Sequence, residues 1–292
     1  EGRFPHALLI SGSSGIGKHH FSRALSALLL CQQPIAGTAC GECRSCDLLS
    51  AGTHSDFMEL TFEGDSRLIK VDQVRRLGEF LSKTAALGKN KMVLLRPADV
   101  MNLNAANALL KNLEEPRPGT YLVLVAEGLS RIMPTVRSRC QNLALADPDQ
   151  TTSAVWLEQF VGEASLAREI LALAGGKPLF AQELFENDKL DYQRALVKAL
   201  EAVSQGTISP LEFPQLVADE ELTEVLALLA GELERYIRDR VAGGERQLQP
   251  QFRVLDDLRL LRRRVIAGAN PNRQLCIESA AIQVAQVVGA TS

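Results

Sequence analysis

A glycine-rich loop between an apolar strand and a helix constrains the fold of this chain more than any other segment. Residues 6–11 form a short apolar run that predicts a buried strand, and residues 20–30 have the composition of a helix. Between them the chain matches the phosphate-loop pattern Gly-x-x-x-x-Gly-Lys, with glycines at Gly12, Gly15 and Gly17 and the lysine at Lys18. Such glycines let backbone N–H groups turn toward a phosphate, while the lysine and the helix amino terminus supply positive charge. The strand–loop–helix context makes the match more specific than the bare pattern.

Strands and helices alternate as far as Asp147, which favours an α/β fold with a parallel sheet. Further strands are predicted over 91–95, 121–125 and 141–146, and helices over 71–86 and 102–115. After Pro148 the pattern is helical throughout. A chain of 292 residues, 46% of them hydrophobic, is long enough for two or three cores. We therefore expect an α/β domain over 1–147, a small helical domain over 148–187 and a larger helical domain over 188–292.

The phosphate loop lacks the residues that would let it hydrolyse a nucleotide. The pattern requires Ser or Thr after the lysine to bind Mg²⁺, but His19 stands there, and an imidazole is a poor ligand for this oxygen-seeking cation. The strand over 91–95 ends in Arg96 and Pro97, where a hydrolase needs an acidic residue, and Asp99 follows too late. The next strand ends at Glu127, with no Thr or Asn to contact a γ-phosphate. We expect a relic loop that takes at most a nucleotide or phosphate weakly. Productive nucleotide binding is the alternative.

Four of the six cysteines lie within sixteen residues, at Cys31, Cys40, Cys43 and Cys46. In a chain expected to be cytoplasmic, such a cluster indicates a metal site before it indicates disulfides. Four thiolates at short spacing favour a tetrahedral structural zinc in a module over 31–46. An iron–sulfur cluster is the rival, although the usual continuation after the last cysteine is missing.

The net charge of −3 does not favour a strongly basic nucleic-acid binder. No apolar run approaches the roughly 20 residues that span a bilayer, so a membrane partner is not expected. A stand-alone zinc protein that binds nucleic acid is a further alternative, but it leaves the helical region after residue 188 unexplained. Arg139, in a Ser-Arg-Cys segment between a short helix and a strand, could be an ordinary surface residue on this evidence alone.

Several segments together resemble the delta-prime subunit family of the bacterial DNA polymerase III clamp loader, a family of AAA+ proteins. The match is strong over residues 1–180 and is carried by the segments 40–46, 51–56, 107–116, 137–140 and 175–178. The helix with the letters NALLKNLEEP, followed by Ser-Arg-Cys, is its most specific part. The resemblance implies a RecA-like AAA+ domain with a zinc module, a small helical lid and an all-α collar that packs in a ring of subunits. It also implies that an N-terminal stretch precedes Glu1 in such proteins.

The resemblance gives Arg139 a role. In this family an arginine at that place acts as an arginine finger, which reaches the ATP of an adjacent tau or gamma subunit. The implied function is a clamp-loader stator that hydrolyses no ATP itself. Its implied partners are the tau/gamma and delta subunits, and through them the sliding clamp and primer–template DNA. An active P-loop ATPase subunit of a replication complex is the alternative, and His19 and Arg96 speak against it.

Overall fold

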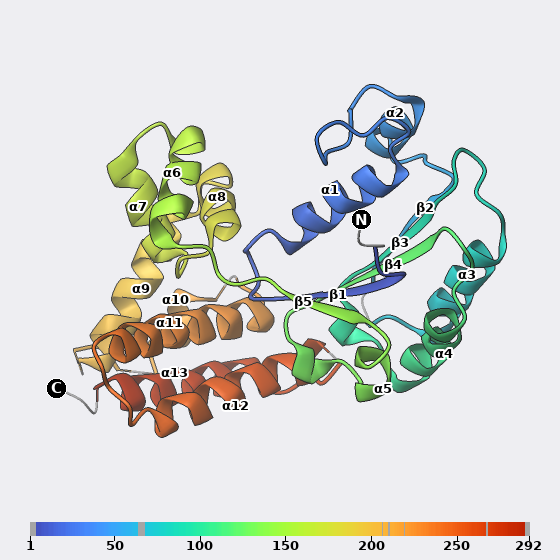
Figure 1. Cartoon of the computed structure of the whole chain (residues 1–292). Coiled ribbons are helices and arrows are strands. Elements are labelled where there is room, and N and C mark those ends of the chain that lie inside the picture. Colours follow the sequence, from blue (N-terminus) through green and yellow to red (C-terminus); the bar gives the residue numbers. More distant parts are fainter. Residues whose placement is uncertain are drawn as a thin grey trace. The chain divides into compact units, whose positions relative to one another are not determined.

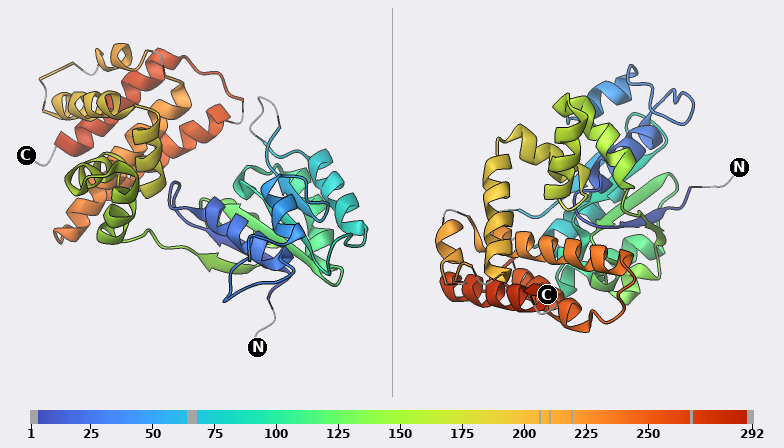
Figure 2. Two further views of the ribbon diagram at one scale, coloured as in Figure 1. Left: turned by 90° about the horizontal axis from the view of Figure 1, so that it is seen from above. Right: turned by 90° about the vertical axis from the view of Figure 1, so that its left-hand side faces the viewer.

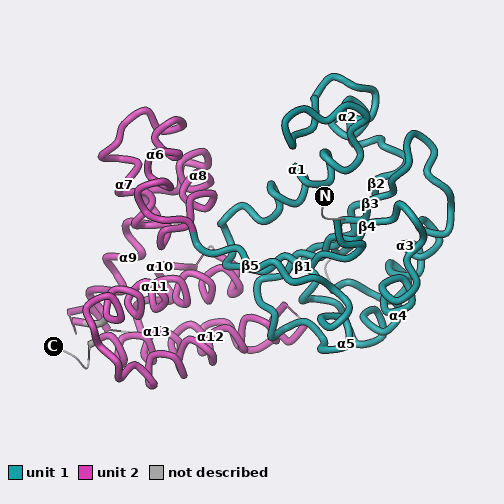
Figure 3. Tube along the Cα trace, viewed as in Figure 1, with its two compact units in different colours: residues 1–147 teal, residues 148–292 magenta. Residues whose placement is uncertain are grey.

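A computed structural model of the chain describes residues 4–289, except 64–67, 206, 210, 219 and 267 (Figure 1; further views in Figure 2). Contacts divide the protein into two compact units, residues 1–147 and residues 148–292 (Figure 3). The division falls between Asp147 and Pro148, where the alternation of strands and helices ends in the sequence.

Unit 1 is built on a five-stranded sheet in which all strand pairs are parallel. The order β2-β3-β4-β1-β5 places β1 between β4 and β5, so that Ser11 lies beside Ala126 on one side and Ala144 on the other. The predicted parallel α/β fold is confirmed. The strands are β1 (Ala7–Ser11), β2 (Phe57–Leu60), β3 (Lys91–Leu95), β4 (Thr120–Ala126) and β5 (Gln141–Ala144).

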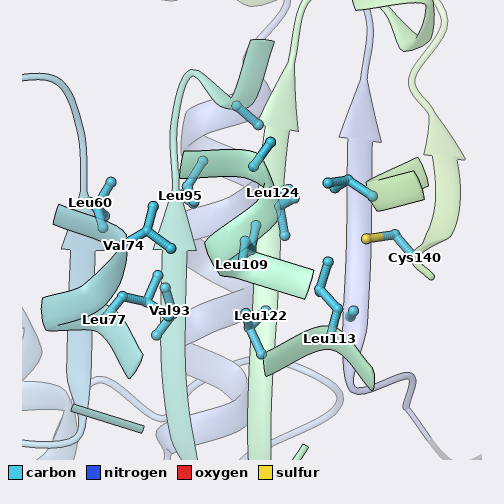
Figure 4. Packing of buried hydrophobic residues seen from close by; sticks show 14 of the residues in the cluster. Leu60, Val74, Leu77, Val93, Leu95, Leu109, Leu113, Leu122, Leu124 and Cys140 are labelled. Carbon is cyan, nitrogen blue, oxygen red and sulfur yellow. The ribbon is translucent and has the colours of Figure 1, made fainter. Parts of the chain in front are cut away.

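Helices cover both faces of this sheet because the strands are apolar on both sides. The helices of unit 1 are α1 (Lys18–Leu30), α2 (Arg44–Ser50), α3 (Val71–Ser82), α4 (Leu103–Glu114) and α5 (Pro134–Arg137), with short 3-10 turns η2 (Ala98–Val100) and η3 (Leu129–Arg131). Leu9, Val93 and Leu124 pack against α3 and α4 in one core (Figure 4). Their strand neighbours Leu8, Leu94 and Val123 pack against α1 in another.

Two predicted element boundaries differ from the structure, and one strand was not predicted. The helix predicted to run to residue 86 ends at Ser82, because Lys83 is already extended and its N–H bonds the carbonyl of Phe80. The last strand ends at Ala144, two residues early. The strand β2 was not predicted, because four residues at the edge of a sheet, three of them only half-buried, leave little pattern.

Unit 2 is helical, as the sequence indicates. It comprises α6 (Gln150–Val161), α7 (Ala164–Leu173), α8 (Pro178–Glu186), α9 (Leu190–Ser204), α10 (Phe213–Leu216), α11 (Leu222–Ala242), α12 (Gln249–Ile266) and α13 (Arg273–Gly289). Its buried side chains form one cluster from α6–α8 and a second from α9–α13. Helices α11, α12 and α13 lie side by side, as Figure 2 shows. Within the described part of the chain, every helix is too short or too polar to cross a lipid bilayer.

Candidate functional site

The phosphate-loop residues connect β1 to the amino terminus of α1. Gly17 caps the helix with φ 95°, a left-handed conformation that favours glycine. A Cβ on Gly12 would lie 2.6 Å from the carbonyl oxygen of Leu145, so only glycine fits there. Lys18 is the first residue of α1, and its Nζ donates a hydrogen bond to the carbonyl of Ser13 at 2.6 Å. The lysine therefore folds back onto the loop that precedes it.

The position after the lysine belongs to a cluster of charged side chains that the sequence analysis missed. His19 Nε2 lies 3.1 Å from Glu59 Oε1, Arg23 Nη1 lies 2.9 Å from Glu59 Oε2, and Arg96 Nε also donates to Glu59. Burial lowers the pKa of His19, and the charge of Arg96 lowers it further, so the imidazole is neutral at pH 7. Burial alone would raise the pKa of Glu59, but the hydrogen bond and charge of Arg96 outweigh it and lower the pKa. The carboxylate that contacts His19 is thus already paired with two guanidinium groups.

The end of β3 carries cations where a hydrolase would carry acids. Arg96 follows the strand directly and is engaged by Glu59. Asp99 lies in η2 and is only 4% exposed, with Arg131 Nη1 at 3.2 Å from its Oδ2. Burial and the nearby Glu127 raise the pKa of Asp99. Glu127, after β4, is itself 2.5 Å from Arg131. Asp99 and Glu127 are therefore both paired with Arg131.

The four clustered cysteines converge, as expected for one metal ion. Their Sγ atoms all lie within 4.8 Å of one another, and the closest pairs are 3.5–4.0 Å apart. Zn–S bonds of about 2.3 Å would put the corners of a tetrahedron about 3.8 Å apart, so the spacing fits a single ion. These distances are far longer than the roughly 2.05 Å of a disulfide. The set Cys31, Cys40, Cys43 and Cys46 can hold a metal ion.

The cysteine module is fixed to the sheet domain by a chain of buried hydrogen bonds. Ser45 Oγ donates to the carbonyl of Leu30, the last residue of α1, at 2.7 Å. His54 Nε2 lies 2.8 Å from the same hydroxyl, and His54 Nδ1 accepts the N–H of Asp56 at 3.0 Å. Since Nδ1 is an acceptor, the ring proton belongs on Nε2. Burial lowers the pKa of His54, which favours this neutral form.

Arg139 lies between two buried anchors. Val136 and Cys140 both belong to the core between the sheet and helices α3 and α4, and Cys140 is labelled in Figure 4. Burial raises the pKa of the Cys140 thiol to about 11, so this cysteine packs as an apolar residue. Arg139, between them, keeps 36% of its side chain exposed. The Ser-Arg-Cys segment therefore fixes a backbone position while leaving the guanidinium at the surface.

The predicted residues form three separate groups. The phosphate loop follows the carboxyl end of β1, whereas Arg139 precedes the amino end of β5. Strands β1 and β5 are parallel and pair from Leu8–Gln141 to Ser11–Ala144. At about 3.3 Å per residue, this stretch separates the two groups by more than roughly 10 Å along the strands. The cysteine module, between α1 and β2, is the third group.

Comparison with known proteins gives consistent matches. A family model described as DNA polymerase III, delta subunit, matches residues 1–149. DNA polymerase III subunit delta' of Pseudomonas aeruginosa is 37% identical, over 97% of this chain and 93% of that protein. The subunit of the same name from Escherichia coli is 41% identical, over 68% of this chain and 60% of that protein.

Among solved structures, a DNA polymerase III, gamma subunit-related protein from Thermotoga maritima superposes with a TM-score of 0.50. It is 20% identical and the match covers 97% of this chain and 94% of that one. At this identity the likeness concerns the fold alone.

Proposed function

Because the chain belongs to the DNA polymerase III subunit delta-prime family, we propose that it is a clamp-loader subunit that hydrolyses no ATP and lends Arg139 to a neighbouring subunit's ATP site. Its partners are tau or gamma subunits and delta. Through the assembled complex it serves the loading of a sliding clamp onto primer–template DNA.

The inactivity of the chain's own loop is supported by what surrounds it. The place of the Mg²⁺-binding hydroxyl is taken by His19, which is bonded to Glu59. Arg96 stands where an acid would polarise water, and Asp99 is held by Arg131. Gly12, Gly15, Gly17 and Lys18 still form a loop that can accept a phosphate weakly, without the metal that phosphoryl transfer requires.

The position of Arg139 carries the second half of the proposal. Arg139 precedes the amino end of β5, whereas the phosphate loop follows the carboxyl end of the neighbouring strand β1. This separation along the strands is too large for Arg139 to serve its own loop. A planar cation that cannot reach its own site is suited to act across a subunit boundary, where it stabilises the charge that develops on the γ-phosphate.

The test of the finger is Arg139→Ala in the reconstituted complex. We expect normal folding and assembly, and a fall of DNA-stimulated ATP hydrolysis on the order of 10³-fold at the site that Arg139 serves. Unchanged hydrolysis at every site would refute the role. The competing view, an active ATPase, predicts sustained turnover by the isolated chain with Mg²⁺ that Lys18→Ala abolishes.

For the metal, we propose that the cysteine module holds one structural Zn²⁺. Support comes from the convergence of four sulfurs, because four thiolates fill the tetrahedral positions and leave none open for a substrate. A multi-iron cluster would need its cysteines spread around several metal atoms. Metal analysis of the purified chain is expected to find about one zinc per chain. Iron with visible absorbance would contradict the assignment.

The helical unit is proposed to form a lid over 148–187 and a collar over 188–292. The two separate cores of unit 2, from α6–α8 and from α9–α13, support this division. The collar would join the corresponding helical domains of the partner subunits in a ring.

A further inference from the structure

All three nitrogens of the Arg139 guanidinium have contacts within the chain. Its Nε donates to Glu114 Oε1 at 2.7 Å, and its Nη2 lies 2.6 Å from the same oxygen. Its Nη1 donates to the carbonyl of Thr135 at 2.9 Å and to Ser138 Oγ at 3.3 Å. Each of its three nitrogens therefore has an acceptor before any neighbouring subunit is present.

The partners of Arg139 come from two segments that the core brings together. Glu114 ends α4, and the residue before it, Leu113, is buried. Arg139 is followed by the buried Cys140. Leu113 and Cys140 belong to the same core cluster (Figure 4). The ion pair thus sits at the rim of a packed contact between α4 and the segment after α5.

The charge at the end of α4 favours a cation there. Glu114 is the last residue of the helix, where the helix dipole adds partial negative charge to that of its carboxylate. The pair remains open to water, with 36% of the Arg139 side chain and 48% of the Glu114 side chain exposed. An ion pair so exposed is weak and can be replaced by a stronger anion.

We infer that Glu114 is a positioning residue that latches Arg139. It holds the guanidinium on its own chain until the phosphates of a neighbouring ATP, which carry more charge, replace the carboxylate. No covalent step is involved, because one charged acceptor is exchanged for another. This inference rests on the proposed finger role of Arg139 and concerns the regulation of that role.

The test uses the assembled clamp loader with primed DNA and clamp. Glu114→Gln keeps the size of the side chain and removes its charge, so release of Arg139 becomes easier. Single-turnover ATP hydrolysis is expected to rise about two- to five-fold, the range that a weak exposed ion pair allows. The matched control, Glu115→Gln, changes the net charge equally on the adjacent residue and is expected to leave the rate unchanged.

Two further measurements separate this inference from the finger assignment. In an Arg139→Ala background, Glu114→Gln is expected to have no further effect. In the isolated chain, the Nε–H NMR signal of Arg139 is expected to shift with Glu114→Gln and not with Glu115→Gln. A fall in rate, a rate equal to that of the control, or an effect that persists without Arg139 would overturn the latch. If Arg139→Ala alone leaves hydrolysis unchanged, the finger role itself fails.

Discussion

The two ends of one parallel sheet have opposite chemistry. At the carboxyl ends of the strands, Glu59 of β2 and Asp99 after β3 are each tied to arginines, and Lys18 after β1 folds back onto its own loop. At the amino end of β5, Arg139 stands at the surface on buried anchors, in an exposed and weak ion pair. The first end has charged groups locked together, and the second has a charge that can leave its partner.

This difference bears on the proposed loss of catalysis, which would leave the architecture of the sheet unchanged. The glycines and the helix start at residues 12–18 are required by the β1–α1 turn itself, because Gly12 and Gly17 fit positions that other residues would strain. The fold does not require side chains for metal and water chemistry at these positions, and His19, Arg96 and Asp99 are engaged in ion pairs here. If the two ends are independent, a change at one end should leave the properties of the other unchanged.

The largest effect is expected from Arg139→Lys. Lysine keeps the positive charge but lacks the planar set of donors that fits a phosphoryl group. We expect hydrolysis at the neighbouring site to fall on the order of 10²-fold, with an unchanged melting temperature of the isolated chain. The control is Arg137→Lys, an exposed residue at the end of α5. A wild-type rate with Arg139→Lys would mean that charge alone suffices.

A smaller effect, on stability alone, is expected from Glu59→Gln. Glu59 is only 19% exposed and is bonded to Arg96, Arg23 and His19. Losing this charged acceptor should lower the free energy of unfolding by about 1–3 kcal/mol at pH 7, measured by urea denaturation. ATP hydrolysis by the assembled complex should not change. Glu63→Gln, which breaks the exposed pair with Arg76, serves as the control and should cost at most about 1 kcal/mol.

The low pKa of Glu59 predicts that the effect of Glu59→Gln on stability depends on pH. The pKa of Glu59 is lower in the folded protein than in the unfolded chain, so its stabilisation is present above the unfolded pKa of about 4.3. It is lost as the pH falls through the folded pKa. The difference in stability between wild type and Glu59→Gln should therefore shrink upon acidification below about pH 4.3. A difference that stays constant would contradict the low pKa.

The smallest effect is expected from His19→Thr. The change restores the hydroxyl that the phosphate-loop pattern requires, but Arg96 still follows β3 and Asp99 is still held by Arg131. We expect no Mg²⁺-dependent ATP turnover by the isolated chain. Turnover that appears in His19→Thr and disappears when Lys18→Ala is added would show that a single side chain had silenced the site.

The sequence predicted much of unit 1 because its signals are local. The apolar runs over 91–95 and 121–125 are strands β3 and β4, and the segment with glycines at 12, 15 and 17 is the turn before α1. The cysteine spacing predicted a set of converging sulfurs, which the structure contains. The edge strand β2 was missed because its burial is partial, and Glu59 was missed with it. The one signal for it was the apolar run around Glu59, at residues 57–60.

The sequence by itself determined the parallel α/β plan, the helical second unit, the cysteine set that can hold a metal ion, and the family. Each of these depends on residues close together in the chain or on the likeness of whole segments. Only the tertiary structure decided which charges meet. Glu59 reaches His19 and Arg96, and Glu114 reaches Arg139, across 25 to 40 residues of chain. Such contacts depend on the order β2-β3-β4-β1-β5 and on the packing of α4. Local patterns do not determine that order, because a strand has the same pattern whichever neighbour it pairs with.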